Sequence, residues 1–129
     1  MQNHWTAELF NAIDTMNTDK FASFIAEDGT LTFGNNPSVT GRENIHAVID
    51  GFFKAIAGIS HKVQNVLEAD GHVIMRGTST YTRHDGSRLT TPFCNVFKME
   101  GDKIKTYDIY IDLSQLFAPV AADVAVSNN

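Results

Sequence analysis

The sequence predicts an α+β domain, in which a cone-shaped, curved and mostly antiparallel sheet wraps around three N-terminal helices and encloses a pocket. Apolar residues recur at helical spacing in the first part of the chain, whereas alternating β-branched runs fill the part after Gly58. Short turn sequences join these runs, so successive strands should be antiparallel neighbours. Helices followed by such strands pack on one face of the sheet, and strands of about ten residues twist enough to curl.

The first helix is expected over residues 3 to about 17, because apolar side chains repeat there every three or four positions. They are Trp5, Leu9, Ala12, Ile13 and Met16. Thr18 can then cap a second, shorter helix over residues 19–28, which ends at Gly29. A short strand, "GTLTF", should follow this helix.

A third helix should follow the loop "GNNPSVTG". Thr40 followed by Glu43 forms a capping-box pattern, which predicts that the helix begins at this point. Its apolar positions then follow at helical intervals, and they are Ile45, Val48, Ile49, Phe52, Phe53 and Ile56.

Four long strands are expected next, with the sequences "ISHKVQNVLEA", "HVIMRGTSTYTR", "RLTTPFCNVFKM" and "KIKTYDIYID". Residues 70–71, 84–87 and 100–102 are the turns between them, which makes the four strands a meander. We therefore expect one domain over residues 1–117. Residues 118–129 begin at a breaker and end polar, so they are expected to form a loosely attached C-terminal tail.

The composition argues against several classes of function. Fifteen acidic and ten basic residues give a net charge of −5 without a basic cluster, so we expect no nucleic-acid partner. Cys94 is the only cysteine, and no histidine pair with metal-ligand spacing has a third ligand, so we expect no metal. Sequence signatures of nucleotide cofactors are absent, so we expect no cofactor. The sequence has no basic leader and no run of eighteen apolar residues, so we expect no membrane partner and a cytoplasmic location.

The strand "TTPFCNVFKM" places one polar residue on an apolar face. Phe93, Asn95, Phe97 and Met99 alternate on that face, and an unpaired buried amide costs about 1–3 kcal/mol. Asn95 therefore has a structural partner in the sheet, at a helix end or through a buried water, or it faces a cavity and contacts a ligand.

His61 is the candidate general acid or base. Alternation along its strand groups it with Val63, Asn65 and Leu67 on the inner face. An imidazole can take or give a proton near neutral pH, so an inward histidine suits acid/base catalysis. The alternative is a histidine fixed by a backbone carbonyl at the rim of the cavity.

The order of these elements, together with "FIAEDGTLTF", "GRENIHAVIDGFF", "SHKVQNV" and "EGDKIKTYDIYID", resembles the SnoaL-like proteins of the nuclear transport factor 2-like superfamily. The resemblance covers roughly residues 4–117 and implies the cone-shaped fold. Members of the superfamily include ketosteroid isomerases, limonene epoxide hydrolases, scytalone dehydratase and polyketide cyclases, along with binding proteins without known chemistry. The fold therefore leaves the function open.

The resemblance implies three catalytic candidates. His61 matches the strand histidine of SnoaL-like proteins, and Asn95 matches the position of a hydrogen-bond donor to the oxyanion in the isomerases. Asp112 matches an aspartate that acts as acid or base in the polyketide cyclases. Strict alternation turns Asp112 away from the cavity, so either a bulge re-aims it or its carboxylate caps the following turn.

Other signatures of the superfamily are missing. The base of the isomerases would fall at Phe33, which cannot accept a proton, and the Arg and Asp of the epoxide hydrolases would fall near Gly77 and Ser79. Scytalone dehydratase is described by a strand histidine paired with a carboxylate on the first helix. Asp14 lies opposite the apolar stripe of that helix, so we do not expect such a pair with His61.

Further inward side chains complete the expected ligand pocket, namely Phe33, Asn35, Ser79, Tyr81, Phe93, Phe97, Tyr107 and Ile109. The leading hypothesis is a pocket for a small hydrophobic oxygenated molecule, with cofactor-independent isomerisation, dehydration, cyclisation or hydrolysis as the chemistry. The alternatives are a non-catalytic carrier or sensor and a dimeric scaffold. Mixed side chains on the outer face of the sheet, including Arg76, Asp108 and Tyr110, predict a homodimer through that face.

Overall fold

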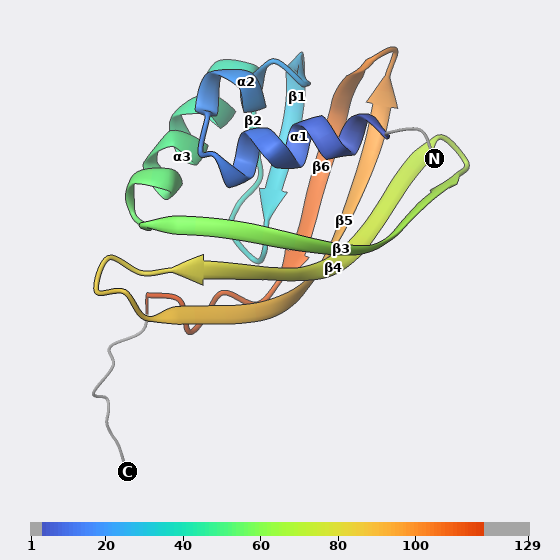
Figure 1. Ribbon diagram of the computed structural model, residues 1–129. Coiled ribbons are helices and arrows are strands. Elements are labelled where there is room, and N and C mark those ends of the chain that lie inside the picture. Colours follow the sequence, from blue (N-terminus) through green and yellow to red (C-terminus); the bar gives the residue numbers. More distant parts are fainter. Residues whose placement is uncertain (1–3, 118–129) are drawn as a thin grey trace.

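The computed structural model describes residues 4–117, and the expected tail over residues 118–129 lies outside this part. The helices are α1 (Trp5–Asp14), α2 (Thr18–Ala22) and α3 (Arg42–Lys54). The strands are β1 (Ile25–Phe33), β2 (Val39–Thr40), β3 (Gly58–Ala69), β4 (His72–Thr82), β5 (Arg88–Glu100) and β6 (Lys103–Ile111). The three helices lie together on the concave side of one curved sheet (Figure 1), which confirms the predicted α+β class.

The six strands form a mixed sheet in the order β2-β1-β6-β5-β4-β3. Strands β3 to β6 form the predicted meander of antiparallel neighbours. Strand β1 joins the far side of β6 and runs parallel to it, with Leu31 opposite Tyr107. As a result, β3 is an edge strand of the sheet.

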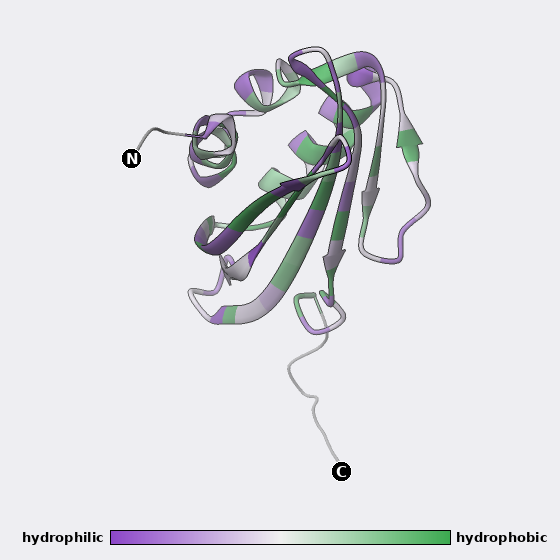
Figure 2. Cartoon of the chain, turned by 90° about the vertical axis from the view of Figure 1, so that its right-hand side faces the viewer, coloured by the Kyte–Doolittle hydropathy of each residue, from purple (hydrophilic) through white to green (hydrophobic). Residues whose placement is uncertain are grey.

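The hydrophobic core lies between the helices and the concave face. Bands of hydrophobic and hydrophilic residues alternate along the strands (Figure 2), as expected for a sheet with one covered face. Fully buried side chains from helices and strands meet there, among them Leu9, Phe21, Ile45, Met75, Phe97 and Tyr107. The apolar stripes predicted for the first and third helices are thereby confirmed as core, except at Val48, which is 44% exposed.

The second helix is shorter than predicted. α2 ends at Ala22, and residues 25–29 belong to β1. Ile25 pairs with Ile104 of β6, so this segment is drawn into the sheet by a strand that lies at the other end of the sequence. Tertiary pairing therefore overrides the local helical pattern.

The helix caps also differ from the prediction. Asn17, not Thr18, caps α2, because its side-chain oxygen accepts a hydrogen bond from the N–H of Lys20 at 3.1 Å. α3 begins after Gly41, whose φ of 100° favours glycine and which offers no side chain. The capping box predicted from Thr40 is therefore wrong.

A β-bulge in β3 changes which side chains face the core. The pairing register shifts just before Asn65, near Gly77 of β4. A Cβ on Gly77 would overlap the carbonyl oxygen of Lys62, so glycine permits the close approach of the two strands. Beyond the bulge, Asn65 points outward and accepts a hydrogen bond from Nε of Arg76 at 2.8 Å. The expectation that Asn65 and Leu67 share the inner face with His61 is therefore wrong, and Leu67 is 58% exposed.

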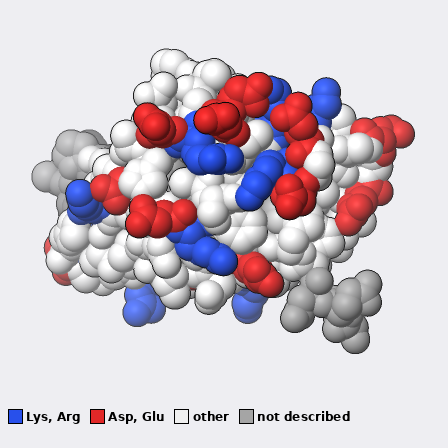
Figure 3. Space-filling model, turned by 90° about the horizontal axis from the view of Figure 1, so that it is seen from above, with Lys and Arg blue, Asp and Glu red and all other residues white. Residues whose placement is uncertain are grey.

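Charged side chains of both signs are interspersed on the face seen from above (Figure 3), so that face carries no broad basic field. Several charges are paired, as in Lys105 with Asp28 at 2.6 Å and Lys54 with Asp50 at 2.9 Å. Within residues 4–117, no helix has both the length and the apolar composition needed to cross a bilayer.

Candidate functional site

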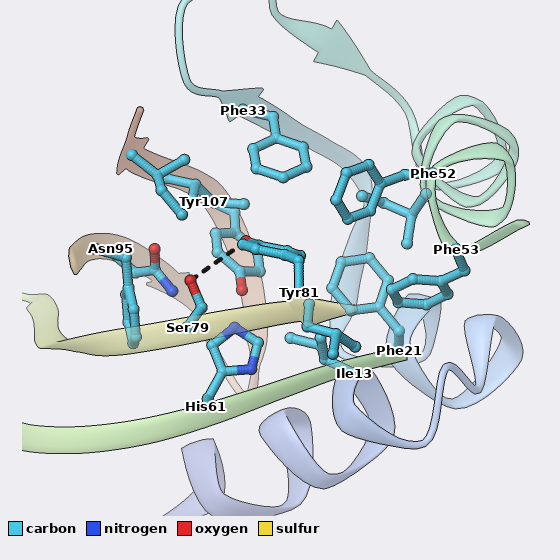
Figure 4. A pocket seen from close by; sticks show the side chains of 15 residues that line it. Ile13, Phe21, Phe33, Phe52, Phe53, His61, Ser79, Tyr81, Asn95 and Tyr107 are labelled. Carbon is cyan, nitrogen blue, oxygen red and sulfur yellow. Dashed lines mark hydrogen bonds between the residues drawn. The ribbon is translucent and has the colours of Figure 1, made fainter. Parts of the chain in front are cut away.

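A cavity lies between the helices and the concave face of the sheet (Figure 4). The volume of this cavity is about 40 Å³. Fifteen side chains line it: Ile13, Phe21, Phe33, Ile49, Phe52, Phe53, Ile59, His61, Ser79, Tyr81, Phe93, Asn95, Tyr107, Ile109 and Ile111.

Asp14 holds His61 through both oxygens of its carboxylate. Oδ1 accepts a hydrogen bond from Nδ1 of the ring at 2.6 Å, and Oδ2 accepts one from the backbone N–H of His61 at 3.2 Å. The strand β3 lies at the edge of the sheet, so this backbone N–H has no neighbouring strand to bind. The carboxylate thus provides a hydrogen-bond partner for the backbone N–H at the edge of the sheet and also orients the imidazole.

The expectation that Asp14 stands apart from His61 is wrong. Asp14 is the last residue of α1 and follows Ile13, whose side chain lines the cavity. α1 packs against the edge strand β3 as well as against the core. A helix with two packing partners has two inward sides, and the stripe of Leu9 marks only one of them.

The imidazole of His61 is oriented for proton transfer. Because an ionised carboxylate can only accept, the bond to Asp14 requires the proton on Nδ1, and this leaves the lone pair of the neutral ring on Nε2. The ring points from β3 toward Ser79 and Tyr81 (Figure 4), so Nε2 faces the cavity. The rings of Phe10 and Phe93 contact the imidazole edge to face, with centroid distances of 4.6 Å and 5.3 Å, and restrict its rotation.

Asn95 faces the cavity, and its amide oxygen has no partner among the described residues. Its side chain is 97% buried, at 3% relative exposure, and its Oδ1 has no hydrogen-bond partner within residues 4–117. Its partners on the neighbouring strands are the apolar Met75 and Ile109. Figure 4 shows its nitrogen on the side of Ser79. The structure therefore places Asn95 on the wall of the cavity, without a hydrogen bond to its Oδ1 from the described protein groups.

Three hydroxyl groups complete the polar surface of the cavity. Ser79 donates a hydrogen bond to the hydroxyl of Tyr81 at 3.4 Å. Burial raises the pKa of Tyr81, and burial together with the neighbouring Tyr81 raises the pKa of Tyr107 strongly. Both phenols therefore keep their protons at neutral pH and can donate hydrogen bonds into the cavity.

Eight of the eleven predicted site residues line this one cavity: His61, Asn95, Phe33, Ser79, Tyr81, Phe93, Tyr107 and Ile109. Asp112, Asn35 and Phe97 do not. Phe97 is fully buried in the core, with its ring 4.5 Å from that of Tyr107. Asn35 is exposed and lies with Asp112 in a separate surface pocket.

Asp112 takes the structural role that strict alternation favours. Its Oδ1 accepts a hydrogen bond from the N–H of Ser114 at 2.9 Å, so the carboxylate caps the turn after β6. This bond and the Ser114 side chain lower the pKa of Asp112. We therefore leave Asp112 out of the catalytic set.

Sequence reasoning rejected Asp14 and missed the walls contributed by Ile13 and Phe21. Periodicity places the latter two in the core, but it does not say which core residues border a void. The resemblance to scytalone dehydratase was a signal for Asp14, but the position of Asp14 opposite the apolar stripe argued against it. Within the described residues, no three His, Cys, Asp or Glu side chains gather in a way that could hold a metal ion.

Comparisons with known proteins match this chain to one family profile and to solved structures with a similar fold. The profile of a family described as "SnoaL-like domain" matches residues 6–107. No match was found among curated proteins. At identities below 20%, as in the solved structures that follow, a likeness concerns the fold alone.

Three solved structures illustrate the similarity. A protein with a ketosteroid isomerase-like fold from Catenulispora acidiphila, in complex with trimethylamine, has a TM-score of 0.80 at 18% identity, over 88% of this chain and 89% of that one. An NTF2-like protein of unknown function from Burkholderia pseudomallei has a TM-score of 0.78 at 18% identity, over 86% and 90%. An LEH-like epoxide hydrolase from M. tuberculosis has a TM-score of 0.74 at 15% identity, over 87% and 83%.

Proposed function

The chain belongs to the SnoaL-like domain family, and from that premise we propose that its cavity binds a small hydrophobic oxygenated molecule on which His61 catalyses a proton transfer. The observation that carries this proposal is the bidentate contact of Asp14 with His61, which leaves Nε2 facing the cavity. A histidine held in one tautomer beside a buried cavity suits a general base.

In the proposed reaction, Nε2 of His61 takes a proton from a carbon or oxygen atom of the ligand. Asp14 stabilises the imidazolium that forms. The amide N–H of Asn95 donates to the ligand oxygen on which negative charge develops. The proton then returns to a second atom of the ligand or to a departing oxygen, so His61 ends the cycle neutral. Isomerisation, dehydration and cyclisation fit this sequence. Hydrolysis fits it when a water molecule attacks the ligand, gives its proton to Nε2 of His61, and the departing oxygen then receives that proton. None of these reactions needs a cofactor.

The proton transfer can be tested before the natural substrate is known. Neutral cyclic ketones are incubated with the protein in deuterium oxide, and deuterium uptake at the carbon next to the carbonyl is followed by NMR. We expect His61→Ala to slow this exchange by about 10²-fold or more. His46→Ala is the matched control, because His46 forms an exposed pair with Asp19. Equal exchange by the wild type and His61→Ala would refute the proposed catalysis.

The small cavity favours a second candidate, a dimeric scaffold with an empty interior, because about 40 Å³ is far below the roughly 300–1,000 Å³ of ordinary ligand sites. A carrier or sensor is the third candidate. It would bind the molecules that the exchange experiment uses without exchanging their protons, whereas a scaffold would do neither.

We also propose that two copies of the chain join through the outer face of the sheet. Leu67 and Tyr110 on that face are 58% and 61% exposed, which is unusual for large apolar and aromatic side chains in strands. An open groove that runs beside Cys94 and Tyr110 supplies a surface into which side chains of a second copy can pack.

A further inference from the structure

The proposed ligand cannot enter the cavity while its wall side chains stay in place. An apolar cavity of about 150 Å³ holds one benzene molecule, whereas this cavity has about 40 Å³. A ligand with a single ring therefore requires at least one wall side chain to turn aside. The inference below rests on the proposed function, because it concerns the admission of that ligand.

Phe52 is the wall side chain best placed to turn. It is half-buried near the C-terminal end of α3, as is Phe33 on β1. The remaining aromatic walls are between 94% and 98% buried, namely Phe21, Phe53, Tyr81, Phe93 and Tyr107. Its contacts with the rings of Phe33 and Tyr81 are edge to face, with centroid distances of 5.0 Å and 5.9 Å. Such contacts are worth about 0.5–1.5 kcal/mol each, so a rotation that breaks them is accessible.

The chain after β6 contacts Phe52 and is itself fastened by Arg83. Phe117 is 58% exposed, yet its ring meets Phe52 edge to face at 6.3 Å. Arg83 fastens this segment to β4, because its guanidinium donates to the carbonyl oxygens of Gln115 and Leu116 at 3.1 Å and 2.9 Å. Leu116 is fully buried and anchors the same segment in a small apolar cluster.

We propose that Phe52 is the gate of the cavity, that Arg83 keeps it shut through the segment ending at Phe117, and that the gate admits neutral molecules of one ring and excludes larger ones. Phe33 lies next to Phe52 on the wall of the cavity (Figure 4) and is half-buried like it, so its ring limits how far Phe52 can turn. Phe52 thus sets the size limit of the ligand, and Arg83 is a positioning residue that acts through the gate.

The charge of the ligand follows from the lining. Among the described residues that line the cavity, His61 is the only one that can carry a positive charge, and Asp14 already balances it. A carboxylate ligand would lose its hydration without gaining a free cationic partner. A neutral hydroxyl or carbonyl group can instead bind Asn95, Ser79 or Tyr107.

Fluorine NMR tests the gate with three probes: 4-fluorophenol, 6-fluoro-2-naphthol and 4-fluorobenzoate. Wild-type protein is expected to bind the one-ring phenol and to bind the two-ring naphthol and the benzoate at least tenfold more weakly. Phe52→Ala should bind the naphthol at least tenfold more tightly than the wild type does. Phe52→Leu should also bind the naphthol more tightly than the wild type does, and this variant replaces Phe52→Ala in the test if Phe52→Ala does not fold. Phe24→Ala, which removes another half-buried phenylalanine outside the cavity, should match the wild type.

Arg83→Lys keeps the charge but loses the fork that reaches two carbonyl groups. We expect it to raise both the association and dissociation rates of 4-fluorophenol severalfold, from line-shape analysis, while the dissociation constant stays within about twofold. A change in stability alone would not produce this pattern. Unchanged rates in a folded Arg83→Lys would overturn the role of Arg83.

The outcomes separate the gate from the pocket. Equal naphthol binding by the wild type, Phe52→Leu and Phe52→Ala would overturn the gate and leave the pocket standing. A lack of binding of all three probes to the wild type and to both Phe52 variants would overturn the proposed pocket and the gate with it. If the protein exchanges protons on ketones but the Phe52 variants bind the three probes as the wild type does, the proposed function stands and the gate is refuted.

Discussion

Asp14 and His61 are separated by 47 positions in the sequence and are joined by two hydrogen bonds, one to the imidazole and one to the backbone. The carboxylate satisfies a backbone N–H at the edge of the sheet and presents Nε2 to the cavity. A single side chain therefore fixes both the position of helix α1 on β3 and the tautomer of the candidate base.

Asp14→Asn is expected to change the tautomer of His61. The amide can offer its N–H to the ring, so Nδ1 no longer needs to carry the proton, and the protonated nitrogen can turn into the cavity. Long-range proton–nitrogen NMR spectra distinguish the two tautomers directly. Proton exchange on a bound ketone should fall by about 10²-fold or more in the same variant.

The matched control for this variant is Asp19→Asn. Asp19 forms a pair with His46 at 2.7 Å on the surface, so the same chemical change is made at an exposed aspartate–histidine contact. His61 should keep its tautomer in this protein. A wild-type His61 spectrum in Asp14→Asn would contradict the role assigned to Asp14.

Asn95→Leu is expected to stabilise the fold and to abolish ligand binding. The substitution removes a buried acceptor that has no partner, and the adjacent cavity leaves room for the branched side chain. We expect the free energy of unfolding in urea to rise by about 1 kcal/mol. Loss of more than about 1 kcal/mol would instead mean that the amide is a structural element of the sheet.

Alkaline pH should destabilise the protein through its buried tyrosines. Burial raises the pKa of Tyr81 and Tyr107 in the folded state above the unfolded value of 10.0. A raised folded pKa means that the stability is present below about pH 10 and declines as the pH rises further, by about 1.4 kcal/mol per unit for each tyrosine. Urea unfolding between pH 9 and 11 should show a shallower decline in Tyr107→Phe, and Tyr110→Phe on the outer face is the control.

Gly77→Ala should destabilise the protein strongly, by more than about 2 kcal/mol, because the added Cβ would overlap the carbonyl oxygen of Lys62 at the bulge. Gly51→Ala is the matched control. A Cβ at this position of α3 meets no atom within 4 Å, so alanine should stabilise the helix by about 0.5–1 kcal/mol. A tolerated Gly77→Ala would show that β3 can straighten.

The proposed dimer predicts a particle of about 28 kDa, twice the 14.2 kDa of the chain, by size exclusion with light scattering. Tyr110→Glu places a charge on the outer face and should give a monomer without changing the cavity. Wild-type protein that stays at the mass of one chain at micromolar concentration would refute the dimer.

Local patterns predicted much of the fold but not its long-range pairings. Alternation and turn sequences were sufficient for the meander from β3 to β6, because each strand there pairs with its neighbour in the sequence. The parallel pairing of Ile25 with Ile104 was missed, because the periodicity of apolar residues predicts a strand but not the strand with which it pairs. The bulge before Asn65 was missed because it depends on Gly77, which lies on another strand.

The same distinction between local pattern and long-range contact separates the site residues that were predicted from those that were not. Alternation placed His61, Ser79 and Asn95 correctly on the inner face, since each lies in a regular stretch of strand. It could not place Asp14, because a helical stripe reports contact with the core and not contact with a crossing strand. Phe97 shows the converse limit, as an inward side chain can fill the core without touching the cavity.

The parallel pairing of β1 with β6 also governs when the domain can be completed during synthesis. Strand β1 leaves the ribosome early, but its partner is β6, which at 5–20 residues per second follows after roughly 4–16 s. Until then β1 exposes an unpaired edge, and the wall that carries Tyr107 and Ile109 does not exist. The nascent chain therefore acquires its cavity only after β6 has been made, and a chaperone that shields β1 during this interval would act on the stage most exposed to aggregation.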